Sequence, residues 1–100
     1  VHIGHNSVIR EGAILCGGVC LAGGTTIGRF AYIGGMSGIG NKAAVGDYAK
    51  IGAMSLVDKD VPAEGTSVGN PQRTHRDHFK AHAILNRLVA DRDRKKEKEE

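Results

Sequence analysis

The sequence is poor in large apolar rings: its 100 residues include two Phe, two Tyr and no Trp. A compact core of this size usually contains several aromatic side chains, because each buries a large apolar area. Proline is scarce, and no run of about 18 apolar residues exists that would cross a membrane. The chain begins with Val and has no basic stretch followed by an apolar one, so we expect no signal peptide and a fragment whose start lies upstream. The core must therefore be built from small side chains.

Cysteine is scarce as well. Cys16 and Cys20 are the only two, and their spacing matches no metal-binding or redox motif. We interpret them as small buried apolar residues of a protein in a reducing, cytoplasmic environment.

Charge is unevenly distributed along the chain. The net charge is +3, yet residues 1–70 hold equal numbers of basic and acidic side chains, so the excess lies entirely in residues 71–100. The basic pI near 9.1 is therefore a property of the C-terminal segment. It is weak support for nucleic-acid binding, and we expect no nucleic-acid partner.

Glycine and small aliphatic residues are abundant, and they follow a period of six. Every sixth position is Ile, Leu or Val: Ile3, Ile9, Leu15, Leu21, Ile27, Ile33, Ile39, Val45, Ile51 and Val57. A second stripe, two positions earlier, is small or β-branched: Val1, Ser7, Ala13, Val19, Thr25, Ala31, Ser37, Ala43, Ala49, Ser55 and Val61. Glycine follows the aliphatic residue at Gly4, Gly28, Gly34, Gly40, Gly46 and Gly52.

A period of six excludes an ordinary helix, which repeats at about 3.6 residues, and an alternating sheet, which repeats at 2. One hexapeptide forms a short strand and a corner, and three hexapeptides close one triangular coil. Successive coils then stack at the usual strand spacing of about 4.8 Å. The predicted fold class is an all-β solenoid of hexapeptide repeats, with the recurrent glycines at corners where a side chain or a negative φ would be awkward.

The period ends near residue 61, and the sequence then changes character. Residues 62–73 contain Pro and Gly pairs typical of a loop. Thr74 and Asp77 have the spacing of a capping box, and an apolar stripe from Phe79 to Leu88 predicts an amphipathic helix. The predicted organisation is a β-helix over 1–61, a loop over 62–73, and a C-terminal helix with a charged tail over 74–100, of which Lys95 to Glu100 fray into solvent.

A coil of three hexapeptides stacks equivalent positions of every third repeat, so it predicts which residues meet. His5, Gly23 and Asn41 form one corner column, and Asn6, Gly24 and Lys42 form the next. A histidine can take a proton from an attacking hydroxyl or amine, and a glycine N–H one rung away can face the oxyanion that forms at a carbonyl. The alternative interpretation of His5 is a solvated corner residue.

Several segments resemble a known family. They are Val1–Asn6, Leu21–Gly24, Ile33–Ser37 and Val68–Pro71. They are similar to the C-terminal half of the bacterial hexapeptide acyltransferases of lipid A synthesis, above all the UDP-3-O-acylglucosamine N-acyltransferases. The resemblance covers nearly the whole chain. It implies that the solenoid is a left-handed parallel β-helix followed by one C-terminal α-helix. It also implies a homotrimer with active sites between neighbouring prisms.

The resemblance also implies roles for individual residues. His5 falls on the catalytic general base and Gly23 on the glycine whose amide forms the oxyanion hole. The implied reaction moves a 3-hydroxyacyl chain from acyl carrier protein to the 2-amine of a UDP-3-O-acyl-glucosamine. The acyl-phosphopantetheine of the carrier is the co-substrate, with no bound cofactor and no metal. Lys42 stands where many N-acyltransferases have histidine.

Further residues are assigned to substrate and carrier. His2, Asn6 and Lys42 are candidate substrate-binding residues, and His2 matches a substrate-contacting histidine of the sister UDP-N-acetylglucosamine O-acyltransferases. The segment from Pro71 to Asp77 and the single helix resemble the C-terminal extension of the N-acyltransferases. The candidate surface for the acidic carrier protein is basic: Arg73, Arg76 and Lys80.

Three alternatives remain open. The first is the sister O-acyltransferase or another hexapeptide acetyl- or acyltransferase. The second is a zinc enzyme of the carbonic-anhydrase type, for which the solenoid offers only His2 and His5, and the helix offers His75, His78 and His82. The third is a catalytically inert trimeric scaffold, because the family's upstream uridine-binding domain is absent.

Overall fold

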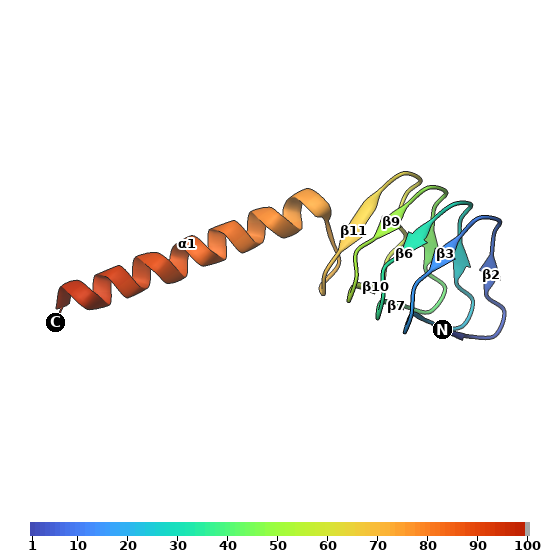
Figure 1. The fold of residues 1–100 in the computed structure, drawn as a ribbon, viewed down its shortest axis with the longest axis horizontal. Helices are drawn as coiled ribbons and strands as arrows, with labels where there is room; N and C mark the ends of the chain where they lie inside the picture. The colour runs from blue at the N-terminus through green and yellow to red at the C-terminus, as the bar shows by residue number, and fades with distance from the viewer. Residues whose placement is uncertain (100) are drawn as a thin grey trace.

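A computed structural model describes residues 1–99, and Glu100, the last residue of the predicted charged tail, lies outside the described residues. The chain forms a triangular solenoid from which a single long helix projects (Figure 1). The whole measures 60 × 23 × 20 Å. It is a left-handed parallel β-helix of about four turns followed by one C-terminal helix, which confirms the predicted fold class.

Short strands recur once in every hexapeptide of the solenoid. They are β1 (His2–Ile3), β2 (Val8–Ile9), β3 (Ile14–Leu15), β4 (Cys20–Leu21), β5 (Thr26–Ile27), β6 (Tyr32–Ile33), β7 (Gly38–Ile39), β8 (Ala44–Val45), β9 (Lys50–Ile51) and β10 (Leu56–Val57). They stack as three parallel sheets: β1-β4-β7-β10, then β2-β5-β8, and then β3-β6-β9, which continues into β11 (Thr66–Val68) and β12 (Arg73–Thr74). Ile3 pairs with Leu21 and Leu21 with Ile39, so each coil holds three hexapeptides, as predicted.

The interior of the prism holds the two predicted stripes. From the second coil onward the aliphatic residues are buried, with Leu21, Ile27 and Ile33 fully so, and the small stripe packs beside them. In the first coil, Ile3 and Ile9 are 51% and 38% exposed, because only one neighbouring coil covers them. Burial between stacked coils therefore supplies the hydrophobic stabilisation without large rings.

The recurrent glycines are needed for space and not for their φ. The left-handed backbone conformation falls two positions later in the repeat, at Asn6, Gly12, Gly18, Gly24, Phe30, Met36, Lys42, Tyr48 and Met54. Gly34 has no positive φ, but a Cβ placed there would lie 2.5 Å from the backbone nitrogen of Ala53 in the next coil. Of the two reasons predicted for these glycines, the lack of room for a side chain is confirmed by the close approach of two coils, and the awkward φ is wrong, because none of them has a positive φ.

The last coil is shorter than the others. Thr66 pairs with Lys50 and Ser67 with Ile51, so this coil falls short of three full hexapeptides. Strand β11 thus continues the third sheet, and β12 returns antiparallel to it. The range 62–73, for which the sequence predicted a loop, contains β11 and the first residue of β12. The division of the chain into domains stays a prediction.

The C-terminal helix α1 (His75–Glu99) begins where the capping residues predicted. The Asp77 N–H donates to the Thr74 Oγ1 at 3.1 Å, so Thr74 caps the first turn. Helix α1 contacts β11 and β12 at its start and then extends away from the prism (Figure 1). Its large apolar side chains are exposed: Phe79, Ile84, Leu85, Leu88 and Val89.

The end of the helix differs from the prediction. Residues 95–99 are helical rather than frayed, which agrees with the high helix propensity of Lys and Glu. Within the described residues, no helix combines the length and the apolarity that a membrane span requires.

The two cysteines are not buried as predicted. Cys20 is exposed and Cys16 is half-buried. Cys20 precedes the inward Leu21 on β4, and adjacent strand residues face opposite sides. The Cys16 thiol donates to the Tyr32 hydroxyl at 3.3 Å. When the thiol is ionised, the Tyr32 O–H donates to the Cys16 sulfur instead; this hydrogen bond and the negative charge of the sulfur raise the pKa of the Tyr32 phenol above its ordinary value.

Candidate active site

His5 lies at the corner between β1 and β2, in the first coil. Asn6 beside it has φ 59°, so the chain turns sharply there. Backbone hydrogen bonds join this corner to the corners above: the Gly24 N–H donates to the His5 carbonyl at 3.0 Å, and the Lys42 N–H donates to the Gly23 carbonyl at 3.1 Å. The structure therefore stacks the two corner columns that the coil length predicted.

The imidazole of His5 lies against Gly23. A Cβ placed on Gly23 would lie 3.3 Å from His5 Cε1 and 3.4 Å from Nε2. This spacing is tighter than most contacts of a real Cβ, so a larger residue at 23 would press on the ring. The absence of a side chain at Gly23 therefore leaves room for the imidazole, whose Cε1–Nε2 edge lies next to the place where a Cβ would stand.

The Gly23 N–H is not used by the backbone ladder of the described residues, in which its neighbour Gly24 donates to His5. At the next corner of the same coil, the equivalent N–H of Arg29 donates to the Asp47 carboxylate at 2.8 Å. The equivalent N–H groups of Gly17, Gly35 and Asn41 also lie outside the ladder, so a free amide is common at this repeat position, and the His5 ring beside it is what distinguishes Gly23. A free backbone N–H next to an imidazole is the arrangement an oxyanion hole needs.

A cavity of about 520 Å³ opens beside this pair. Its lining consists of His5, Asn6, Gly23, Gly24, Asn41 and Lys42. Sequence reasoning nominated four of these residues as site residues and missed Gly24 and Asn41, although both belong to the two predicted columns. His2, the remaining nominated substrate residue, lies on β1 and does not line the cavity.

Lys42 brings a positive charge to the rim of this cavity. It has φ 61°, and its Cγ lies 3.3 Å from where a Cβ of Gly24 would be. The missing side chain at Gly24 thus makes room for the Lys42 stem. A cation at this place suits a phosphate, a carboxylate or the oxygen of a polarised carbonyl.

Asn6 contacts the far side of the His5 ring. Its Nδ2 lies 3.4 Å from His5 Nδ1. A half-turn of the amide exchanges its nitrogen and oxygen, so the same side chain can donate to Nδ1 or accept from an Nδ1–H. In the second arrangement the proton is on Nδ1, and Nε2 carries the lone pair toward Gly23.

The other nominated residues lie elsewhere. Arg73 is on β12, and Arg76 and Lys80 are in the first turns of α1, all exposed and none in the lining of the His5 cavity. His78 and His82 lie close together on α1, with ring centroids 4.6 Å apart. Across the part of the chain that the structure describes, no three His, Cys, Asp or Glu side chains gather as a metal site would require.

No protein-family model matches the chain, and no curated protein matches it. Solved structures do. UDP-N-acetylglucosamine O-acyltransferase from Moraxella catarrhalis is 38% identical with a TM-score of 0.73, over 74% of this chain and 29% of that chain. LpxA from Acinetobacter baumannii is 37% identical with a TM-score of 0.72, over 73% of this chain and 28% of that chain.

A variant of GDP-perosamine N-acetyltransferase from Caulobacter crescentus, in complex with CoA and GDP-perosamine, is also similar. It is 26% identical with a TM-score of 0.57, over 72% of this chain and 40% of that chain. The structural neighbours of the chain are thus hexapeptide acyl- and acetyltransferases, and the chain spans less than half the length of each of these three.

Proposed function

We propose that the chain carries the catalytic corner of an acyltransferase that uses His5 as general base and the Gly23 amide as oxyanion donor. The observation that carries the proposal is the pairing of the His5 ring with the unused Gly23 N–H beside one cavity. The similarity to sugar-nucleotide acyl- and acetyltransferases supports it. No catalytic metal is required, because the base and the oxyanion donor are both supplied by the chain.

The proposed reaction forms an amide. The 2-amine of a UDP-3-O-acyl-glucosamine attacks the thioester carbonyl of an acyl-phosphopantetheine carried by acyl carrier protein. His5 Nε2 takes the proton of the amine, and the Gly23 N–H donates to the oxygen that becomes negative. When the intermediate collapses, the carbon–sulfur bond breaks and the imidazolium returns the proton to the departing thiolate. The products are the N-acylated sugar nucleotide and the free carrier thiol.

Ester formation is the second candidate. The O-acyltransferases among the structural neighbours favour it, since one is 38% identical to this chain. The segment from Pro71 to Asp77 and the single C-terminal helix favour the N-acyltransferase, because they resemble its C-terminal extension. In both reactions His5 and Gly23 have the same roles, and Lys42 is proposed to bind an anionic group of the substrate.

The assembly and the carrier contacts are also proposed. Three prisms would place a groove between neighbours at the His5 corners, as cyclic symmetry allows. Arg73, Arg76 and Lys80 are exposed basic side chains near the start of α1, and we propose that they meet the acidic carrier protein. His2 stays a proposed substrate contact from the exposed side of β1.

The Asn6 amide is expected to hold the tautomer of His5. Asn6→Gly removes the amide and keeps a residue that accepts φ 59°. We expect kcat to fall roughly 10- to 100-fold with KM little changed, because a misdirected imidazole affects the transition state more than binding. Asn6→Asp keeps an acceptor for Nδ1–H, and its charge should move the acidic limb of the pH–rate profile to higher pH.

The matched control is Asn41→Ala. Asn41 lines the same cavity but has no hydrogen bond to His5. If Asn6→Gly and Asn41→Ala had equal effects on kcat, Asn6 would have no positioning role.

The function itself is tested by product analysis. The chain, alone and within the longest natural protein that contains it, is incubated with acyl carrier protein bearing a 3-hydroxyacyl group and with each UDP-sugar in turn. We expect a product whose new acyl group survives mild alkali, as an amide does. An alkali-labile product would establish the O-acyltransferase instead, and no transfer to any sugar nucleotide or amine would refute the enzyme proposal.

A further inference from the structure

The third face of the prism loses its aliphatic column at the last coil. Along this face the inward positions of successive strands hold Leu15, Ile33 and Ile51, each in register with the next. The following inward position is Ser67, which pairs with Ile51. On the second face the last coil keeps an aliphatic residue, Val61. A hydroxymethyl group therefore replaces a branched side chain at one place in the interior.

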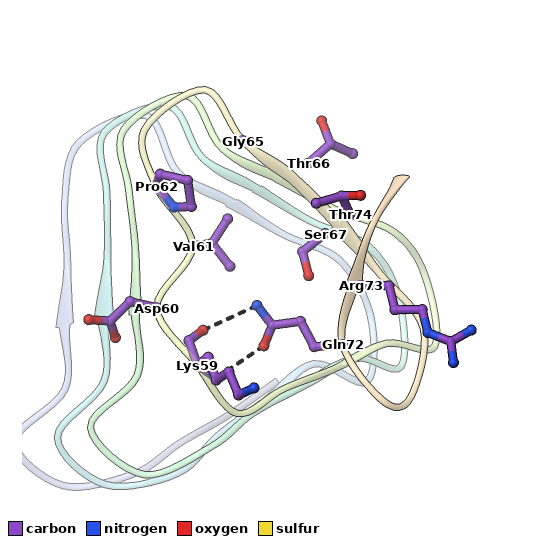
Figure 2. Close-up of a pocket in the computed structure, with 10 residues that line it drawn as sticks. All are labelled: Lys59, Asp60, Val61, Pro62, Gly65, Thr66, Ser67, Gln72, Arg73 and Thr74. Atoms are coloured by element: carbon purple, nitrogen blue, oxygen red, sulfur yellow. Dashed lines mark hydrogen bonds between the residues drawn. The ribbon is translucent and has the colours of Figure 1, made fainter. Parts of the chain in front are cut away.

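A cavity of about 280 Å³ lies beside Ser67, at the end of the prism away from His5. Figure 2 shows Val61 and Ser67 pointing into the triangular space, with Pro62 beside it and Gln72 crossing its lower side. Three charged residues belong to the lining: the side chains of Asp60 and Arg73 point away from the space, and the exposed Lys59 side chain runs along its lower side beside Gln72 (Figure 2). The buried part of the wall, formed by Val61 and Ser67, is thus neutral and largely apolar, and the charged residues lie at the exposed rim.

The Ser67 hydroxyl has no hydrogen-bond partner within the described part of the chain, although the residue is only 4% exposed. The other buried hydroxyls of the prism all have one. Thr25 donates to Ser7, Ser37 donates to the Gly52 carbonyl, and Ser55 accepts from the Gly69 N–H. An unpartnered buried hydroxyl is uncommon, because it loses its hydrogen bonds to water and gains none.

Gln72 forms a fixed wall of the cavity. Its Oε1 accepts from the Asp58 N–H at 3.0 Å. Figure 2 shows its two hydrogen bonds with Lys59: Oε1 accepts from the N–H at 3.0 Å, and Nε2 donates to the carbonyl at 3.3 Å. The amide is therefore engaged with the opposite segment and leaves Ser67 unpartnered. A wall held by three hydrogen bonds makes the cavity preformed, as small-molecule sites usually are.

We propose that this cavity is a binding site for a small neutral molecule with an apolar body and one hydroxyl or carbonyl group. A rotation of the Ser67 side chain about its Cα–Cβ bond brings the hydroxyl, which water cannot reach in this structure, to the polar group of the ligand, and the apolar body packs against Val61 and Pro62. A volume of 280 Å³ accommodates about nine non-hydrogen atoms if each takes the roughly 30 Å³ of a water molecule. An ionised group is disfavoured at the inner end of the cavity, because no charged side chain lies beside Val61 and Ser67 to replace its hydration. The site is separate from the His5 cavity and does not depend on the proposed acyl transfer.

The probe for this site is cyclohexanol, titrated into the isotopically labelled chain and followed by nuclear magnetic resonance. We expect saturable shifts at Ser67 and at the Val61 methyl groups, and none at His5. Ser67→Ala keeps the cavity and removes the hydroxyl, so binding should weaken about fivefold, the value of one ordinary hydrogen bond. Ser67→Val removes the hydroxyl and takes up part of the cavity, so binding should weaken more than in Ser67→Ala. Cyclohexanecarboxylate, the charged probe, should bind more weakly than cyclohexanol.

Two results would overturn the proposal. One is the absence of saturable shifts in the unmodified chain. The other is equal affinity for cyclohexanol in the unmodified chain and in Ser67→Ala or Ser67→Val. Because Ser67→Ala removes a single oxygen, it leaves the coil intact and keeps the test decisive if Ser67→Val were to disturb the last coil.

Discussion

Replacing His5 with alanine is expected to lower kcat about 1,000-fold, within the range that a positioned general base contributes. The amine that attacks the thioester must lose a proton, and Nε2 of His5 is the basic atom that lies beside Gly23 in the cavity lining. The Gly23 N–H remains in the variant, so the rate should stay above that without protein. Turnover is measured with acyl carrier protein and the sugar nucleotide that the product analysis identifies.

The control variant is His2→Ala. His2 lies on the same first coil and is also exposed, but it does not line the cavity. We expect a change in KM at most and a kcat near that of the unmodified chain. Both variants should unfold at the same temperature as the parent, since exposed histidines bury little surface. A near-normal kcat for His5→Ala would remove His5 from the mechanism.

Gly34→Ala is expected to lower the free energy of unfolding by about 3 kcal/mol or more, the upper range for an overpacked interior. Its Cβ would lie 2.5 Å from Ala53 N and 2.8 Å from Ala53 Cα. Neither atom can move freely, because the ladder holds the two coils together; the Gly34 N–H itself donates to the Ile51 carbonyl at 2.8 Å. Relief therefore requires separating two stacked coils.

Gly17→Ala provides the matched comparison. A Cβ at Gly17 would meet nothing within 4 Å, and its φ is outside the left-handed region. We expect unchanged or slightly higher stability. Alanine lowers the conformational entropy of the unfolded chain, which can raise the free energy of unfolding by roughly 0.4–1 kcal/mol. The measurement is urea denaturation of each variant, in which the midpoint and the slope m together give the free energy of unfolding. Equal destabilisation of both variants would mean that coil contact is not what requires glycine at position 34.

The sequence predicted the prism well wherever the period of six persisted. The stripe through Leu21, Ile39 and Val57 shows which side chains point inward, and its spacing gives the length of one coil. The strand register follows, because residues one coil length apart pair with each other. The prediction ended at residue 61 because the stripe ends there. The later pairing of Ser67 with Ile51 rests on backbone hydrogen bonds and a shortened coil. Backbone pairing is largely independent of side-chain identity, so no residue pattern marked it.

The backbone conformation of the corners could not be predicted from local residue preferences. Local preference assigns left-handed backbone to Gly and Asn, yet Phe30 and Tyr48 adopt it with φ 54° and 59°. The corner hydrogen bonds impose it: the Phe30 N–H donates to the Glu11 carbonyl at 3.0 Å. The two rings then stack with centroids 5.4 Å apart. Hydrogen bonds between coils outweigh the cost of left-handed backbone for a residue with a side chain, about 1 kcal/mol. The residues of one corner do not reveal these hydrogen bonds, because the partner lies in the next coil.

At the candidate site, the sequence predicted that His5 lies close to Gly23, but it did not predict that the Gly23 N–H has no acceptor among the described residues. The coil length placed His5 beside Gly23, and the structure agrees. That the Gly23 N–H is left unused depends on the acceptors around it, such as the Asp47 carboxylate that occupies the equivalent Arg29 N–H one corner away. An unused donor is defined by the whole ladder, so the residues of one corner could not reveal it.

The register of the prism has a consequence for how it folds. Every strand of the parallel sheets pairs with a strand one coil away, and within the described chain no pairing joins distant coils. Such a molecule behaves like a row of coupled units, in which order spreads from neighbour to neighbour and is lost from an end. His5 and Gly23 belong to adjacent units, so their geometry depends on a single coil-to-coil boundary. Hydrogen exchange at that boundary should report the integrity of the site independently of the rest of the prism.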